Sequence, residues 1–388
     1  MKPERSFSKP LCRIGICVVL LLGPAPFLPA WLCGRDAESY FNGDLDRQTA
    51  LARHVISSIE VGVTDDDFQT GSTLYDSEWK FGSYMMAGAG LGQVILEHPQ
   101  TRDEFLPEME KILDALLSDR VAYFDSMKWG EKALENLDGN NDHAAYLGYT
   151  NLILGLHRQI SPQSKFTNWH DRITKALESR LRLSKYLLLE TYPGERYPID
   201  NCSVIGSIAM HARATGRDVS TLLDPLIARW RKEVIDPKTG LLIQGFDSKG
   251  NVIDKPRASG TTFGLYMLSL GEIPLARELF ESTKKECSQS LLGFGSIREY
   301  GRDNPGGKGD VDSGPVLFGT SFSGTGFMIA GCRVYGDFDL FQSLYRTVHL
   351  VGAPLDRGGT LNFVSGGPLG NAIMFALLTA RPMKGGVE

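Results

Sequence analysis

Apolar and polar residues along the chain follow two kinds of helical pattern. In one kind, apolar side chains recur on a single face, as with Phe105, Met109, Ile112 and Leu116, which is the spacing of an amphipathic helix. In the other kind nearly every position is apolar or small, as in residues 84–90, and such a helix is buried on all sides. The body of the chain is therefore predicted to be mostly helical.

The two kinds of helix alternate along the chain. Amphipathic helices are predicted at residues 46–60, 104–117, 166–187, 222–234, 274–287 and 338–351. Apolar, small-rich helices are predicted at residues 79–98, 143–159, 201–214, 259–270, 319–334 and 370–380. Six of each in alternation predict an inner ring of buried helices enclosed by an outer ring, a closed form of the repeat architectures. Residues 240–254 break the pattern and predict a small β-hairpin insertion.

This alternation resembles the (α/α)6 toroid, a fold class that includes the six-hairpin glycosidases and linalool dehydratase-isomerase. The resemblance covers residues 40–385 and rests on the order and type of the helices. It implies an all-α protein with a single toroid domain. It also implies that the loops entering the inner helices converge on one rim.

The N-terminal stretch has the character of a targeting or anchoring segment. Residues 1–13 are basic, and residues 14–32 follow with 19 positions that carry no charge, which is long enough to span a bilayer core. A basic flank on the N-terminal side predicts that the rest of the chain crosses the membrane. A cleaved signal peptide is the alternative to an anchor. Residues 1–33 are thus expected to export the protein to the cell envelope, membrane-anchored or periplasmic or secreted.

Composition narrows the partners and cofactors. The hydrophobic content of 42% supports a sizeable core, and the net charge of −5 gives no basic field for nucleic acid. The cysteines of the body, Cys202, Cys287 and Cys332, form no CxxC pair, so neither a disulfide framework nor a zinc site is indicated. No nucleotide-binding motif is present. We therefore expect no cofactor and no metal.

Carboxylates gather just before the predicted inner helices. The candidate catalytic residues are Glu78, Asp142, His143, Asp200 and Asp312. Glycoside cleavage needs one carboxylic acid beside the leaving oxygen and a second carboxylate as base or nucleophile. We expect Glu78 to be the acid, Asp200 or Asp312 the base, and Asp142 with His143 to position the substrate. Helix capping is the alternative role for the three aspartates.

Aromatic and charged residues on the same predicted rim are candidates for substrate binding. They are Tyr75, Trp79, Tyr197, Cys202, Arg298, Glu299 and Tyr300. The segment from Arg298 to Tyr300 leads into a glycine-rich loop that carries Asp312. Pro315 is expected to start the helix that follows, because proline favours the first helical turn.

Three functions are compatible with this rim. The first is an exported carbohydrate-active enzyme, a glycoside hydrolase or a related activity, that uses rim carboxylates for acid–base chemistry on a glycan. The second is a lyase or isomerase resembling linalool dehydratase-isomerase, which acts on an apolar alcohol and would need a closed pocket lined by Met85, Met86 and Phe327. Residues of the types that this second enzyme uses are Tyr75, His143, Tyr197 and Cys202. The third is a non-catalytic toroid that binds a glycan or a protein.

Overall fold

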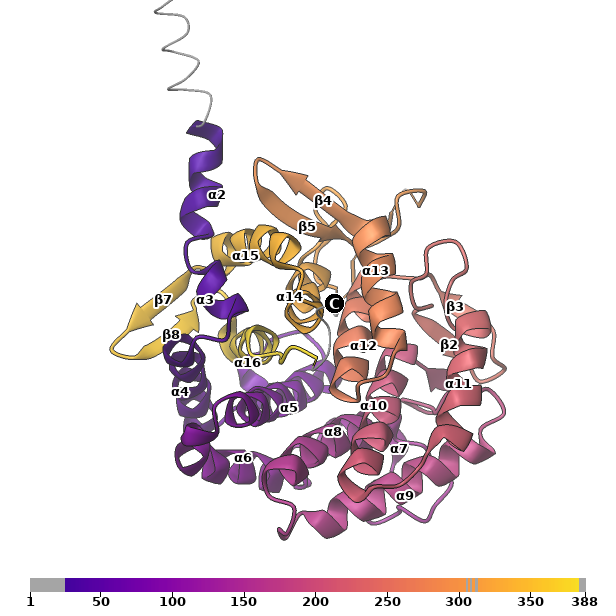
Figure 1. Cartoon of the computed structure of the whole chain (residues 1–388). Coiled ribbons are helices and arrows are strands. Elements are labelled where there is room, and N and C mark those ends of the chain that lie inside the picture. The colour runs from indigo at the N-terminus through magenta and orange to yellow at the C-terminus, as the bar shows by residue number, and fades with distance from the viewer. Residues whose placement is uncertain (1–24, 305, 308, 311–312, 384–388) are drawn as a thin grey trace, which may run out of the picture.

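Twelve long helices form two concentric rings in the computed structural model, which describes residues 25–383 apart from 305, 308, 311 and 312 (Figure 1). The inner helices are α5 (Thr73–Glu97), α8 (Ala144–Ile160), α10 (Pro198–Thr215), α12 (Ala258–Leu270), α14 (Phe322–Tyr335) and α16 (Gly367–Leu378). The outer helices are α4 (Leu45–Val61), α6 (Arg102–Leu116), α9 (Thr167–Leu183), α11 (Ser220–Glu233), α13 (Leu275–Cys287) and α15 (Phe338–Gly352). The predicted (α/α)6 toroid is confirmed.

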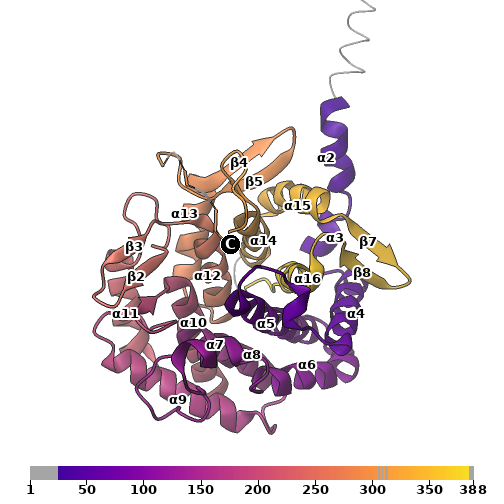
Figure 2. The same cartoon turned by 180° about the vertical axis from the view of Figure 1, so that it is seen from behind.

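The inner ring is closed, since each inner helix packs against the next and α16 returns to α5 (Figures 1 and 2). Glycines allow this close packing. A Cβ atom on Gly206 would lie 2.5 Å from the carbonyl oxygen of Met267, and one on Gly90 would lie 2.4 Å from the ring of Phe375. Both distances are too short for a real side chain, so the small residues of the apolar helices set the diameter of the ring.

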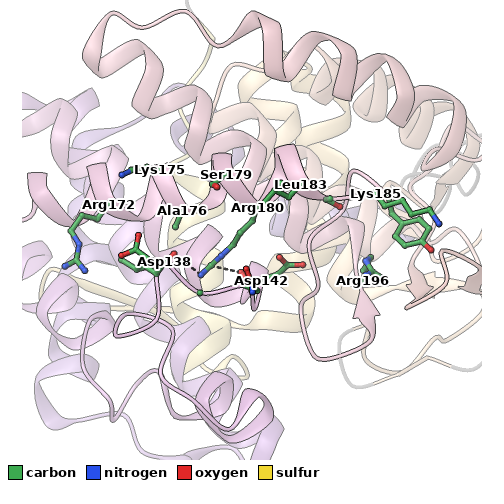
Figure 3. A pocket seen from close by; sticks show the side chains of 15 residues that line it. Asp138, Asp142, Arg172, Lys175, Ala176, Ser179, Arg180, Leu183, Lys185 and Arg196 are labelled. Atoms are coloured by element: carbon green, nitrogen blue, oxygen red, sulfur yellow. Dashed lines mark hydrogen bonds between the residues drawn. The ribbon is translucent and has the colours of Figure 1, made fainter.

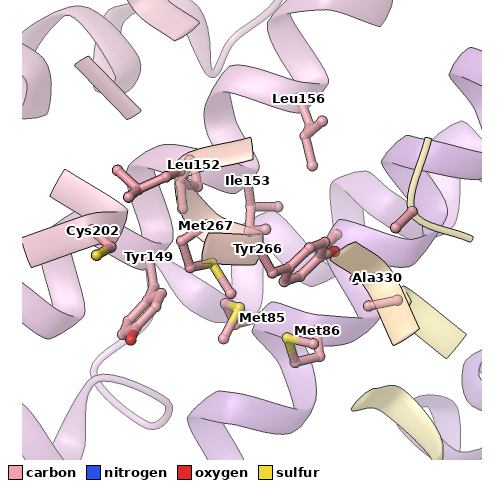
Figure 4. Close-up of a cluster of buried hydrophobic side chains, with 14 of the residues drawn as sticks. Met85, Met86, Tyr149, Leu152, Ile153, Leu156, Cys202, Tyr266, Met267 and Ala330 are labelled. Carbon is pink, nitrogen blue, oxygen red and sulfur yellow. The ribbon is translucent and has the colours of Figure 1, made fainter. Parts of the chain in front are cut away.

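Apolar side chains from several inner helices meet in the middle of the ring (Figure 4). Met85, Met86, Tyr266 and Met267 lie there with 4%, 1%, 0% and 1% of their surface exposed. This cluster is part of one continuous hydrophobic core, and burying a side chain of this size contributes about 1.5–3 kcal/mol. The helices that the sequence predicted to be apolar on all sides are therefore those that build the core.

Small antiparallel sheets decorate the ring. The predicted hairpin is confirmed as β2 (Gly245–Asp247) paired with β3 (Val252–Asp254), and β1 (Glu195–Arg196) adds a third strand. The other strands are β4 (Ser288–Leu291), β5 (Phe294–Arg298) and β6 (Thr320–Ser321) in one sheet and β7 (Pro354–Arg357) and β8 (Thr360–Phe363) in another. The sequence pattern did not predict these two sheets.

Short helices complete the described chain. They are η1 (Ala25–Phe27), α2 (Leu28–Cys33), α3 (Ala37–Phe41), η2 (Asp65–Asp67), η3 (Pro99–Thr101) and α7 (Tyr123–Trp129). Among the described residues, no helix is long and apolar enough to cross a membrane. Most of the predicted N-terminal segment, residues 1–24, lies outside the described residues.

Two helix starts differ from the prediction. Helix α5 begins at Thr73 rather than near residue 79, so Tyr75 and Glu78 lie in its first turns instead of in a preceding loop. Asp200 likewise lies in the first turn of α10, which begins at Pro198.

The prediction that Pro315 starts an inner helix was wrong. Strand β6 keeps the chain extended by pairing with β5, and α14 begins only at Phe322. Ser321 caps the helix, because its hydroxyl accepts a hydrogen bond from the amide of Gly324 at 3.0 Å. Asp312 is therefore well before the helix start, and it lies outside the described residues.

Candidate active site

Asp200 is held by two hydroxyl groups at the start of α10. Its Oδ1 accepts a hydrogen bond from the Tyr149 hydroxyl at 2.9 Å, and its Oδ2 accepts one from the Thr191 hydroxyl at 2.6 Å. Tyr149 reaches Asp200 because α8 and α10 lie very close together. A Cβ atom on Gly148 would lie only 2.3 Å from the hydroxyl oxygen of Ser203.

The environment of Asp200 favours the protonated acid. Burial raises the pKa of its carboxyl to about 6, although the hydroxyls of Thr191 and Tyr149 lower it in part. Both donors are neutral, so within the described part of the chain no positive charge offsets the loss of water around the carboxylate. A carboxyl with this pKa is suited to general acid catalysis near neutral pH.

Glu78 lies in the same cluster as Asp200. Burial raises the pKa of the Tyr192 phenol, and the carboxylates of Glu78 and Asp200 raise it further. Burial also raises the pKa of Tyr149, and both carboxylates add to that shift. Two carboxylates that act on the same two phenols supply the pair of groups that glycoside cleavage needs.

Two tyrosines flank this pair. The Tyr197 hydroxyl donates to Glu195 Oε2 at 2.7 Å, and burial and Glu195 together raise the Tyr197 pKa, with smaller contributions from Asp200 and Tyr75. Tyr75 is 36% exposed. The structure thus brings together four residues predicted from sequence, which are Tyr75, Glu78, Tyr197 and Asp200. We call these four, with Tyr149, Thr191 and Tyr192, the Asp200 cluster.

Cys202 and Trp79 have packing roles beside the Asp200 cluster. Cys202 is wholly buried, and burial raises its thiol pKa well above the usual value, so the reactive thiolate is disfavoured. Trp79 packs edge to face against Phe68, with 6.0 Å between the ring centroids.

Asp142 and His143 lie at the start of α8 and are engaged elsewhere. Asp142 Oδ2 accepts a hydrogen bond from the amide of Glu190 at 2.8 Å, which fixes the loop that carries Thr191. His143 is wholly buried, with Nδ1 2.7 Å from Asp125 Oδ2 and Nε2 3.2 Å from Glu131 Oε1. Both ring nitrogens of His143 are occupied, so it is not available to a substrate in this structure.

The segment from Arg298 to Tyr300 belongs to a second polar cluster, between α12 and α14. Glu299 is wholly buried, and its Oε1 accepts a hydrogen bond from the Ser259 hydroxyl at 2.6 Å. Burial raises the pKa of Glu299 and of Tyr300. The Glu299 carboxylate also interacts with the Ser321 side chain at the start of α14, so it links the starts of α12 and α14.

Several members of the Asp200 cluster were not expected from sequence. Thr191 and Tyr192 come from the loop between α9 and α10, upstream of the rim segment that the pattern marked. Tyr149 comes from the interior of an apolar helix, where a buried phenol needs a hydrogen-bond partner. That need was the available signal for Tyr149. Among the described residues, no group of three or more His, Cys, Asp or Glu side chains could hold a metal ion.

Solved structures with the same fold are known, although no sequence relative was found. No family model matches the chain, and no curated protein matches its sequence. The structure is similar to the GH76A α-1,6-mannanase from Salegentibacter sp. HEL1_6, at 11% identity and a TM-score of 0.54, over 87% of this chain and 99% of that one. It is also similar to a family 105 glycoside hydrolase from C. acetobutylicum ATCC 824, at 13% identity and a TM-score of 0.50, over 76% of this chain and 92% of that one. The chain thus shares the (α/α)6 toroid fold with these solved structures.

Proposed function

We propose that this protein is a glycan-cleaving hydrolase in which Asp200 is the general acid and Glu78 the base or nucleophile. The observation that carries the proposal is the setting of Asp200, whose carboxyl accepts hydrogen bonds from the neutral hydroxyls of Tyr149 and Thr191. Burial there raises its pKa to about 6, and Glu78 acts on the same two phenols, Tyr149 and Tyr192. Sequence reasoning assigned the acid to Glu78 and the base to Asp200 or Asp312. We exchange the roles of Glu78 and Asp200, because a carboxyl with a raised pKa keeps its proton to a higher pH and can donate it to the leaving group.

The hydrogen bonds of Asp200 fit this role. In the reaction, protonated Asp200 gives its proton to the leaving oxygen of the glycosidic bond. The carboxylate that results is then stabilised by the hydroxyls of Thr191 and Tyr149, which already point at its two oxygens. Tyr75 and Tyr197 supply aromatic faces beside the two carboxylates, and such faces suit the apolar side of a sugar ring.

A glycan substrate is supported by the fold and by the composition of the Asp200 cluster. An inactive variant of the Salegentibacter mannanase, with two aspartates replaced, was solved in complex with α-1,6-mannotriose. That ligand belongs to the mannanase and serves here as the first glycan to test.

The core disfavours the lyase or isomerase alternative. That activity would need a closed apolar pocket lined by Met85, Met86 and Phe327, but Met85 and Met86 are packed inside the core, 4% and 1% exposed. Cys202 is wholly buried and its thiol pKa is raised, which makes it a poor acid.

The test is hydrolysis of a glycan panel that includes α-1,6-mannan, with product release measured by chromatography. Asp200→Asn removes the proton donor and should lower turnover at least about 100-fold. Glu78→Gln should do the same. Asp224→Asn makes the same chemical change as Asp200→Asn on the exposed face of α11, and it should leave turnover unchanged. Glycan binding without product release by the wild-type protein would instead support the non-catalytic toroid.

We also propose that the protein is exported and held at a membrane by its N-terminal segment. The uncharged stretch of residues 14–32 supports this, and so does the exposure of its apolar end. The exposed side chains are Phe27, Leu28, Trp31 and Leu32, at 51%, 52%, 58% and 45%. A topology reporter fused after residue 40 should read out on the non-cytoplasmic side. A cytoplasmic signal would rule out both an anchor and a cleaved leader.

A further inference from the structure

A pocket of about 690 Å³ lies outside the Asp200 cluster, between the C-terminal half of α9 and the loop of residues 137–142 (Figure 3). The loop between α9 and α10 separates it from the Asp200 cluster. In that loop, the amide of Glu190 bonds to Asp142 at the pocket, while the hydroxyl of Thr191 bonds to Asp200. The pocket is therefore distinct from the candidate active site.

Positive charge dominates the lining of this pocket. The cationic side chains are Arg172, Lys175, Arg180, Lys185 and Arg196, against the two carboxylates Asp138 and Asp142. Within the described part of the chain, Arg172, Lys175 and Lys185 form no ion pair. They come from α9 and the residues after it, and Figure 3 shows Arg172 and Lys175 toward one end of the pocket lining and Lys185 toward the other. An excess of cations in a concave site concentrates anions.

Arg180 lines the pocket and has a buried N–H donor, at Nε, without an acceptor among the described residues. Arg180 is only 5% exposed. Its Nη atoms donate to the backbone carbonyls of Asp142, Asn136 and Leu137 at 3.1 to 3.2 Å, which fixes the guanidinium in place. Its Nε has no hydrogen-bond partner among the described residues. A buried unsatisfied donor is uncommon in folded proteins and favours a ligand that brings an acceptor.

We propose that this pocket binds a sugar that carries an anionic group, a carboxylate or a phosphate. The cations select the charge, and Arg180 is a rigid donor for it. The volume is within the range of pockets that hold drug-sized molecules and is larger than a bare anion needs. Asn140, Ser179 and Asp138 line the pocket and supply partners for the hydroxyl groups of a sugar.

Calorimetric titration of the full chain in mild detergent at low ionic strength tests this proposal. The ligands are glucuronate, glucose 6-phosphate, glucose and inorganic phosphate. We expect glucuronate or glucose 6-phosphate to bind, and the one that binds identifies the anionic group. Glucose should bind much more weakly, and the affinity for the charged sugar should fall as salt is added.

Two variants localise the binding. Arg172→Gln combined with Lys175→Gln removes two exposed cations and should weaken binding of the charged sugar by about 3- to 30-fold. Lys232→Gln removes an exposed charge from α11 and should leave the affinity unchanged. The proposal is overturned if neither charged sugar binds, if glucose or inorganic phosphate binds as tightly as the charged sugar, or if the double variant binds like the wild type. None of these results depends on the proposed hydrolysis.

Discussion

An ionisable side chain lies at each end of the ring, Asp200 at the end where the inner helices begin and Arg333 at the end where they finish. At the finishing end, Arg333 is 1% exposed and donates to the carboxylate of Glu97 at 3.1 Å and to the carbonyls of Leu378 and Phe41 at 2.8 and 3.3 Å. At the beginning end, the carboxyl of Asp200 accepts hydrogen bonds from the neutral hydroxyls of Tyr149 and Thr191.

This difference in partners decides what each buried group can do. Burial lowers the pKa of Arg333 from a very high usual value, and Glu97 opposes that shift, so the guanidinium stays charged and joins α14, α16 and α5. Asp200 has no cationic partner among the described residues, and its pKa rises to about 6. A paired charge serves stability, whereas an unpaired carboxyl with a labile proton serves chemistry.

The largest effect on the free energy of unfolding is expected from Arg333→Met, which removes the ion pair with Glu97 at the end where the inner helices finish. Removal of one partner of a buried ion pair costs about 3–5 kcal/mol, because the other charge and the carbonyls lose their donor. Urea denaturation followed by circular dichroism measures this loss. Arg229→Met is the control, since Arg229 pairs with Glu233 on an exposed turn of α11 and should cost at most about 0.5 kcal/mol. Equal losses in the two variants would contradict a structural role for Arg333.

At the end where the inner helices begin, the raised pKa of Asp200 should make the free energy of unfolding depend on pH. The pKa of Asp200 is about 6 in the folded protein, above the usual value of 3.8, so the folded state binds this proton more tightly than the unfolded state does. Stability is therefore highest below about pH 4 for this group and is lost as pH rises to about 6, by about 3 kcal/mol in total. Denaturation from pH 4 to 7 should show this slope in the wild type and not in Asp200→Asn. A parallel slope in both proteins would assign it to other groups.

A smaller effect, on the pKa of Asp200, is expected when one of its hydrogen-bond donors is removed. Thr191→Val keeps the shape of the side chain and removes the 2.6 Å hydrogen bond to Asp200. Because that bond stabilises the carboxylate, the pKa of Asp200 should rise by about one unit, equal to about 1.4 kcal/mol. If the protein is a hydrolase, the alkaline limb of its pH–rate profile should move upward by the same amount. A downward shift would show that Thr191 favours the protonated form.

The helical framework and the candidate site differ in how far the sequence predicts them. The order and burial of the helices follow from periodicity, since a residue such as Met86 or Phe105 reports directly on whether its face meets the core. Predicted rim residues come together where they lie at the starts of α5 and α10, as Glu78 and Asp200 do. The partners of Asp200 come from another helix and from a loop, and their meeting depends on the close approach of α8 and α10 at Gly148.

His143 was predicted to face the rim, but the structure encloses its side chain. Its position at the start of an inner helix matched the pattern of a rim residue, but the side chain is enclosed by Asp125 and Glu131. Those partners lie in α7 and just after it, in a long connection whose path the periodicity does not fix. The direction in which a rim side chain points thus depends on loops, and loops carry little periodic signal.

The protonation of Asp200 is the central claim, and its carboxyl titration is the most direct measurement. Protein labelled with 13C at the aspartate carboxyl carbons would be titrated by NMR, and the Asp200 signal would be assigned by its loss in Asp200→Asn. We predict a midpoint near pH 6, in line with the pKa of about 6 that burial produces. A midpoint at or below pH 4 would mean that the fold does not raise the pKa of Asp200 above its usual value, and it would contradict its assignment as the acid.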